Sequence, residues 1–233
     1  MYKNLYECFA HWYHGGQIYF IADPHFNDEE TKELRRNNIP DDEIIKRINS
    51  TISNRDTLVI LGDIGDVEYV TKLKGKKILI KGNHDKGNIN YKRRFRLKAK
   101  CPYCGKINFL ADWIDDLFSD AGIDYNNIYC DNCSKKLENY KTLVEDNHLF
   151  DEIYEGVLTI SDKIILSHEP VDFKYAFNIH GHTHDNKQFK DDKHLNVCCE
   201  WIDYRPISLK EIVKSGKLKS VKNIHRECID RRN

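Results

Sequence analysis

The stretch "KKILIKGNHD" (residues 76–85) begins as a short apolar run and ends in Gly-Asn-His-Asp. Two earlier stretches have the same pattern: "IYFIAD" (18–23) runs into Pro24-His25, and "TLVILGD" (57–63) runs into a further polar turn. Short runs rich in β-branched or aromatic residues that stop at Gly, Asn or Asp are typical of buried central strands. The three stretches therefore predict three such strands.

Helical patterns lie between these strands. "PDDEIIKRINSTI" (40–52) places four isoleucines on one face after an acidic first turn, and "VEYVTKLKG" (67–75) is a shorter candidate. The alternation of strand and helix predicts an α/β fold, in which ligands bind at the carboxyl edge of the sheet.

The second half of the chain continues this pattern. "GVLTISDKIILSHEP" (156–170) predicts a hairpin whose second strand ends at His168, and "YAFNIHGHTH" (175–184) predicts a strand that runs into a His-rich segment. "HLNVCCEWID" (194–203) predicts another strand, and "SLKEIVKSG" (208–216) predicts a short helix.

The composition describes an ordinary water-soluble chain of 233 residues with 37 basic and 37 acidic side chains. The balanced charge gives no overall attraction to nucleic acid or anionic lipid. No apolar stretch approaches membrane-spanning length, and the first 16 residues lack the apolar core of a signal peptide. We therefore expect a cytoplasmic protein without a membrane partner, in which the eight Cys are reduced thiols or metal ligands.

The segment from about residue 87 to 147 breaks the alternation of strand and helix. Residues 86–106 contain eight Lys or Arg and no acid, whereas the following stretch holds six Asp before Lys135. Within it "LADWIDDLF" (110–118) has the spacing of an amphipathic helix. We expect an inserted module at 87–147, with 1–86 and 148–233 forming the main domain.

Four Cys of this module occur as two C-x-x-C pairs, Cys101 with Cys104 and Cys130 with Cys133, separated by 25 residues. In a reduced compartment this pattern indicates a tetrahedral structural zinc site of the ribbon type. Zinc would supply folding energy that a small module cannot obtain from burial alone. The alternative is four thiols in a loop.

The basic half of the module also contains Tyr91, Phe95 and Tyr103. Cations interleaved with aromatic rings suit single-stranded nucleic acid. The alternative is a solvated face whose charge is balanced by the acidic half.

Polar side chains follow the predicted strands where those strands end. If the strands are parallel neighbours, these groups converge at one edge of a sheet, and imidazole is the commonest transition-metal ligand. Each group alone has a structural alternative: His168 could be a core histidine, and the segment 180–184 a polar turn. The set comprises Asp23, His25, Asp63, Asn83, His84, Asp85, His168, His182 and His184.

The His-rich segment "NIHGHTHDN" (178–186) has three imidazoles on alternate positions. If the strand continued through it, His182 and His184 would share one side. His180 precedes the motif, so we expect it to be structural.

In this order the motifs resemble those of the calcineurin-like metallophosphoesterases, whose pattern reads D-x-H, G-D, G-N-H-D/E, a lone H and G-H-x-H. The resemblance covers roughly residues 17–85 and 150–212, and "DPHF" (23–26) is similar to the small bacterial and phage members. The matching stretches here are Asp23–His25, Gly62-Asp63, Gly82–Asp85, His168 and Gly181–His184.

The resemblance implies a four-layer αββα sandwich with a dinuclear metal centre at the strand ends. Mixed nitrogen and oxygen ligands suit two divalent cations of Mn, Fe or Zn. Two cations about 3.5–4 Å apart can share a hydroxide and clamp a phosphoryl group during in-line attack. The ligands that the resemblance implies for one metal are Asp23, His25, Asp63 and His184. Those for the other are Asp63, Asn83, His168 and His182, with Asp63 bridging.

Two further roles come from the same resemblance. His84 is expected to stabilise the transition state or protonate the leaving oxygen, with Asp85 orienting its ring. The alternative for His84 is a hydrogen-bond donor beside the metal ligands.

The function that the resemblance implies is hydrolysis of phosphate esters, by a phosphomonoesterase or a phosphodiesterase. The alternative class is a nucleic-acid- or protein-binding module built on an inactive phosphoesterase sandwich. The complete set of expected ligands favours the enzyme.

Overall fold

The structure is a computed structural model, and it describes residues 9–34, 39–85, 87, 91–110, 124, 126–160, 164–173, 176–184 and 191–219. The chain separates into two compact units: residues 1–86 together with 150–233, and residues 87–149. That the first unit is the phosphoesterase domain and the second an inserted zinc-binding module stays a prediction.

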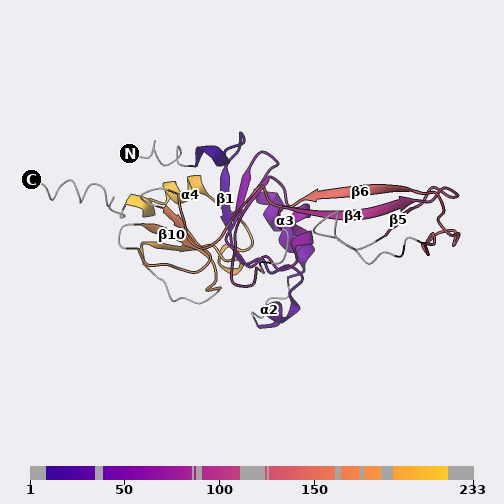
Figure 1. Ribbon diagram of the computed structural model, residues 1–233. Helices are drawn as coiled ribbons and strands as arrows, with labels where there is room; N and C mark the ends of the chain where they lie inside the picture. Colours follow the sequence, from indigo (N-terminus) through magenta and orange to yellow (C-terminus); the bar gives the residue numbers. More distant parts are fainter. Residues whose placement is uncertain are drawn as a thin grey trace, which may run out of the picture. The chain divides into compact units, whose positions relative to one another are not determined.

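Two β-sheets form the first unit (Figure 1). The first sheet has the strand order β12-β1-β2-β3-β7 and the second β11-β10-β9-β8. The parallel strands of the first sheet are β1 (Ile18–Ile21), β2 (Thr57–Ile60), β3 (Lys76–Ile80) and β7 (Glu152–Tyr154), and β12 (Ile207–Ser208) is antiparallel to β1. Those of the second are β9 (Ile164–Leu166), β10 (Phe177–His180) and β11 (His194–Asn196), and β8 (Leu158–Thr159) is antiparallel to β9.

One apolar core joins the two sheets. Phe20, Val59 and Ile78 from the first sheet belong to the same buried cluster as Leu166 and Ile179 from the second. The residues that alternate with them on β1 and β2 are mostly buried as well, so the first sheet is covered on both faces. Strands that are buried on both faces have continuous apolar sequences, and this pattern is what predicted them. The α/β sandwich implied by the resemblance is confirmed.

Short helices accompany these sheets: η1 (Ala10–Trp12), α2 (Glu29–Leu34), α3 (Asp41–Thr51), α4 (Leu209–Lys214) and η4 (Lys217–Lys219). The predicted helix 40–52 corresponds to α3, and Ile44, Ile45 and Ile48 form its buried face. The predicted helix 208–216 corresponds to α4, which Ser208 and Glu211 open with a capping box.

Two segments differ from the sequence-based expectation. The segment expected as an α-helix at 67–75 is a 3-10 helix, η2 (Val67–Lys72). It is short, as 3-10 helices usually are, and its β-branched Val67, Val70 and Thr71 favour an α-helix less than unbranched residues do. The expected strand 194–203 ends at Asn196, and η3 (Cys199–Ile202) follows it. The chain leaves β11 because Cys198 forms an isolated bridge with Ala22, and Asp203 then takes a left-handed conformation with φ 50°.

The second unit contains one antiparallel sheet of order β5-β4-β6, formed by β4 (Arg93–Lys100), β5 (Ile107–Phe109) and β6 (Lys141–His148). Its core is small and consists of Ala99, Cys101, Cys130 and Leu137. The helix predicted at 110–118 lies outside the described residues, apart from Leu110.

None of the helices described in the first or second unit has the length and apolar character that crossing a membrane requires.

Candidate functional site

The parallel strands of both sheets end in loops that carry the predicted polar residues. β1, β2 and β3 pair in parallel register, so the segments after Ile21, Ile60 and Ile80 leave the same edge of the sheet. The second sheet brings its own loops here, because the amide of Gly181 donates to the carbonyl of His168 and the amide of Ala22 to that of Val197. Residues more than 150 positions apart therefore meet at one site.

One group of side chains at this site is formed by Asp23, His25 and His184, whose ligand atoms all lie within 4.8 Å of one another. The ring of His25 is fixed from behind, because its Nδ1 lies 2.8 Å from Asp28 Oδ2. Asp23 Oδ2 accepts hydrogen bonds from the amide of His182 (2.9 Å) and from Cys198 Sγ (3.0 Å). These contacts orient the remaining ring nitrogen of His25 and Oδ1 of Asp23.

A second group is formed by Asp63, His168 and His182, again within 4.8 Å. His168 Nδ1 lies 2.9 Å from the carbonyl oxygen of Leu61 and donates to it, so the neutral ring carries a lone pair on Nε2. His168 Nε2 lies 2.8 Å from Asn83 Oδ1 and 3.1 Å from His182 Nδ1. A proton on His182 Nδ1 can serve the second of these contacts but not the first, which joins two acceptors. A metal cation among the three groups could be bound by all of them.

Asp63 connects the two groups. Its Oδ2 lies 3.6 Å from His25 Nε2 and 3.4 Å from His168 Nε2. Its Oδ1 accepts a hydrogen bond of 2.9 Å from the amide of His84. A single carboxylate oxygen thus faces one imidazole of each group.

The surroundings of Asp23 and Asp63 shift the pKa values of these two carboxylates in opposite directions. Burial raises the pKa of Asp23 above its usual range, against the lowering effect of His168 and His184. Burial also opposes ionisation of Asp63, but its contacts with His25, His168 and the amide of His84 outweigh it and lower the pKa to about 2. A bound cation would favour the ionised form of both.

The backbone at the site is bent at the ligands themselves. Asp23, His25, Asp63, His182 and His184 all have positive φ, between 42° and 67°. This left-handed region is uncommon for residues other than Gly, although Asp and His tolerate it better than most, and such strain clusters at functional sites.

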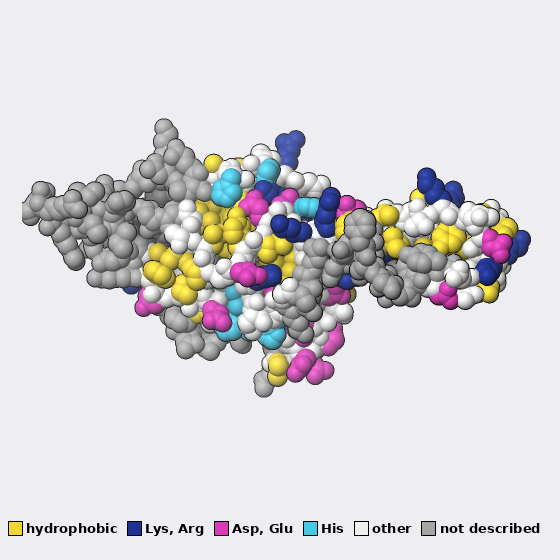
Figure 2. All heavy atoms as spheres, viewed as in Figure 1, with side chains coloured by type: hydrophobic (Ala, Val, Ile, Leu, Met, Phe, Trp, Pro, Cys, Tyr) yellow, Lys and Arg dark blue, Asp and Glu magenta, His cyan; other side chains and the backbone are white. Residues whose placement is uncertain are grey.

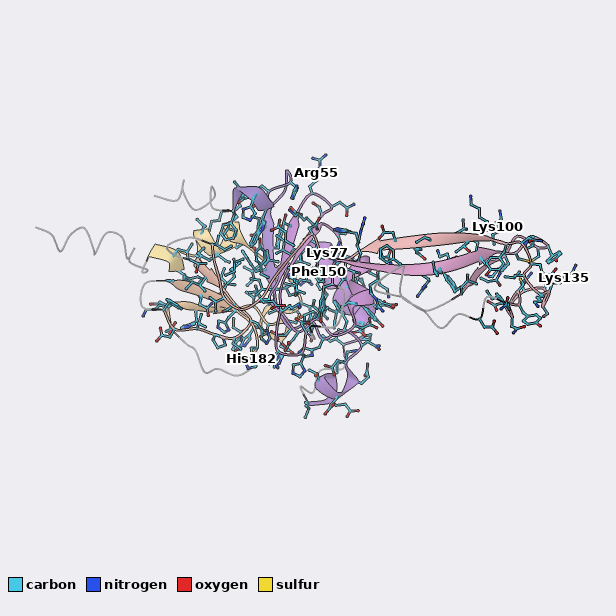
Figure 3. The ribbon with its side chains drawn as sticks, in the orientation of Figure 1. Arg55, Lys77, Lys100, Lys135, Phe150 and His182 are labelled. Atoms are coloured by element: carbon cyan, nitrogen blue, oxygen red, sulfur yellow. The ribbon has the colours of Figure 1, made fainter. Side chains whose placement is uncertain are left out.

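The bend separates the two histidines of the last motif. β10 ends at His180, so the alternation of a strand does not extend to the motif, and His182 and His184 join different groups. Figure 3 labels His182 in the segment after β10. A Cβ atom at Gly181 would collide with Asp23 Oδ2 and the side chain of Ala22, which explains the glycine.

His180 has the structural role expected for it. It is 1% exposed, and its Nδ1 contacts the carbonyl oxygen of Gly181. Burial lowers its pKa to about 4, so the ring is neutral at physiological pH.

The hydrogen bonds of Asp85 are with backbone amides, and the role expected for it beside His84 stays a prediction. Its Oδ2 accepts from the amides of Asp63 (2.9 Å) and Gly82 (2.8 Å), and its Oδ1 accepts from the amide of Ile64 (3.1 Å). Asp85 thus links the loops after β2 and β3 through these amides. The His84 ring is exposed and lies with its centroid 5.6 Å from that of His25.

Two contributors were missed in the sequence. Asp28 fixes His25 and also accepts hydrogen bonds from the amide and hydroxyl of Thr31. In the sequence, an Asp at this position indicates only the start of a helix. Cys198 contacts Asp23 across 175 positions, and no spacing in the sequence indicates that contact. Both Cys198 and Cys199 are buried.

The four Cys of the second unit form a third group of potential metal ligands. Cys101 Sγ lies 3.7 Å from Cys133 Sγ, and Cys104 Sγ lies 3.6 Å from Cys130 Sγ. Four sulfurs around Zn at 2.3 Å would be separated by about 3.8 Å, so these distances match a tetrahedral site. Burial opposes ionisation of Cys130, but the amides of Asn132 and Cys133 lower its pKa to about 6.

Both C-x-x-C pairs sit in the same backbone structure. In "CPYCGK" (101–106) the amide of Cys101 donates to the carbonyl of Lys106, and in "CDNCSK" (130–135) the amide of Cys130 donates to that of Lys135. The residue after the second Cys has positive φ in each turn, 75° at Gly105 and 55° at Ser134. The two turns are copies of one ligand-presenting structure.

Comparisons with known proteins agree with this geometry. A family model described as calcineurin-like phosphoesterase matches residues 16–199. A crystal structure of a protein of unknown function from Aquifex aeolicus superposes with a TM-score of 0.51 at 22% identity, covering 85% of this chain and 98% of that one. This similarity concerns the fold alone. No curated protein matches the chain.

The contact between Asp28 and His25 leads to a testable prediction. Asp28→Ala removes the carboxylate behind His25, and loss of such a partner typically weakens metal binding about 10–100-fold. Manganese affinity measured by isothermal titration calorimetry should fall by this amount. Glu29→Ala is the matched control, because Glu29 starts the same helix and its side chain is 76% exposed. Equal affinity of the two variants would contradict the role given to Asp28.

Proposed function

This chain belongs to the calcineurin-like phosphoesterase family, and we propose that its two groups of Asp and His side chains bind a pair of divalent transition-metal cations. As a member of this family, the protein is a metal-dependent hydrolase of phosphate esters. The pair of cations, their identity among Mn, Fe and Zn, and the ester that is cleaved belong to the proposal.

The proposed ligands follow the two groups. Asp63 would be shared, and the position of its Oδ2 between His25 Nε2 (3.6 Å) and His168 Nε2 (3.4 Å) is the single observation that supports a dinuclear centre most strongly. The proposed set for one cation is Asp23, His25, His184 and Asp63. The proposed set for the other is His168, His182, Asn83 and Asp63.

The donor chemistry fits such cations. The imidazoles, carboxylates and amide oxygen are the mixed ligands that Mn, Fe and Zn accept. When bound, two cations stabilise the developing charge on a phosphoryl group and lower the pKa of coordinated water.

The protein's own residues then have separate tasks. Asp28 holds the tautomer of His25, and the carbonyl of Leu61 holds that of His168. The hydrogen bond that the backbone amide of His84 donates to Asp63 Oδ1 places the exposed ring of His84 next to the site. From there its protonated imidazole would donate a proton to the leaving oxygen. Phosphomonoesters and phosphodiesters both fit this arrangement.

The competing class is a binding module on an inactive sandwich. None of the seven proposed ligands is replaced by another residue type in this sequence. Contacts in the structure bring four of them together: Asp63, Asn83, His168 and His182. An intact ligand set supports the enzyme.

We propose that the Cys group of the second unit binds a structural zinc ion. Four thiolates would leave no open position for substrate, so this metal would stabilise the unit and take no part in hydrolysis. The small core of the unit makes that contribution important.

The catalytic proposal predicts distinct effects of two substitutions. With added Mn²⁺, the protein should hydrolyse p-nitrophenyl phosphate, bis(p-nitrophenyl) phosphate or both. Asp63→Ala should abolish activity and lower the bound metal, since it removes the shared ligand. His84→Ala should keep the metals and lower kcat about 10²–10⁴-fold, the usual contribution of a proton donor.

His11→Ala serves as the control, because His11 is exposed and lies in η1, outside the proposed ligand set. Its kcat should equal that of the unchanged protein. Hydrolysis of neither ester with Mn²⁺, Fe²⁺ or Zn²⁺ would instead favour the binding module.

The zinc proposal is tested separately by metal analysis. Purified protein should contain one zinc that resists Asp63→Ala and is lost in Cys101→Ser, and the latter variant should become sensitive to proteolysis between residues 87 and 149. Cys199→Ser, at a buried Cys of the first unit, should keep that zinc. Retention of zinc in Cys101→Ser would overturn the proposal.

A further inference from the structure

The sheet of the inserted unit has two unlike faces. Directly paired residues of an antiparallel sheet point to the same side, so the strand register sorts its residues into faces. One face contains Leu97, Ala99 and Asn108, which are at most 9% exposed and cover the small core. The opposite face is formed by the residues that alternate with them.

This opposite face is strongly basic, and we call it the basic sheet face. Lys98 lies between Phe109 on β5 and Leu143 on β6, and Lys100 lies between Ile107 and Lys141. Glu145 is the acid that the strand register places on this face among the described residues, and it pairs with Lys98 at 2.5 Å. The cations of the face are Arg94, Arg96, Lys98, Lys100 and Lys141.

Two of these cations oppose each other directly. Lys100 and Lys141 are Cα partners on β4 and β6, and both are exposed. Like charges at directly opposite positions destabilise a sheet. Within the described part of the chain no carboxylate is recorded in an ion pair with either lysine. An anion bound between them would relieve the repulsion.

Exposed apolar side chains lie next to the cations. Phe109 is 57% exposed and Ile107 is 43% exposed. The guanidinium of Arg96 lies 4.8 Å and the ammonium of Lys98 5.4 Å from the centroid of the Phe109 ring. On the inserted unit, Figure 2 shows yellow apolar side chains beside dark-blue Lys and Arg, and Figure 3 labels Lys100 and Lys135 there.

We propose that the basic sheet face binds single-stranded nucleic acid. Phosphates would contact Lys100 and Lys141, and a base would stack on the Phe109 ring, which is how sequence-tolerant single-strand sites combine charge and stacking. A duplex keeps its bases stacked on one another and cannot use Phe109 in this way. The inference is independent of the phosphoesterase proposal, because it concerns the inserted unit alone.

The test is fluorescence anisotropy of a labelled 20-nucleotide oligothymidylate with the full-length protein, at several salt concentrations. Lys100→Glu should raise Kd about tenfold or more and make the salt dependence shallower, by about 0.7 per lost phosphate contact. The same variant should melt at an unchanged or higher temperature, because Glu would face Lys141. Phe109→Ala should raise Kd by about fivefold or more with little change in salt dependence.

Lys46→Glu is the matched control, with the same change of charge at a side chain of the first unit that is 78% exposed. It should bind the oligonucleotide as the unchanged protein does. The proposal is wrong if the oligonucleotide does not bind, or if Lys46→Glu weakens binding as much as Lys100→Glu. It is also wrong if a 20-base-pair duplex competes as well as the single strand does.

Discussion

The site depends on a buried carboxylate that two groups of imidazoles share. Asp63 lies at the end of a central strand, 1% exposed, with one oxygen fixed by a backbone amide and the other facing both His25 and His168. Water solvates a carboxylate well, so burying one is costly unless charges or donors replace the water. Around it Asp85 fastens two loops through backbone amides, and bent backbones at Asp23 and elsewhere aim the ligands inward.

Much of this arrangement could be predicted from the sequence, for an identifiable reason. The residues at strand ends, such as Asp23 and His168, are visible because apolar runs stop abruptly there and the strands are parallel. The contacts of Asp85 and Cys198 could not be predicted, because they depend on how separate loops fold over one another. The separation of His182 from His184 was missed because periodicity describes strands and the chain leaves β10 just before them.

Backbone amides act on the proposed metal ligands of both units. The amide of His84 orients Asp63 in one unit, and the amides of Cys133 and Asn132 lower the pKa of Cys130 in the other. The ligands proposed for the first unit mix nitrogen and oxygen donors, a combination that suits catalytic metal ions. The four equal ligands of the second suit a closed structural ion, whose binding would hold the sheet that carries the basic residues.

The central claim is that Asp63 lies between two cations. Anomalous diffraction from crystals grown with manganese tests it most directly. We expect two peaks at the strand ends, one next to His25 and His184 and one next to His168 and His182, with the Asp63 carboxylate in contact with both. A single peak, or peaks that the Asp63 carboxylate does not touch, would contradict the account.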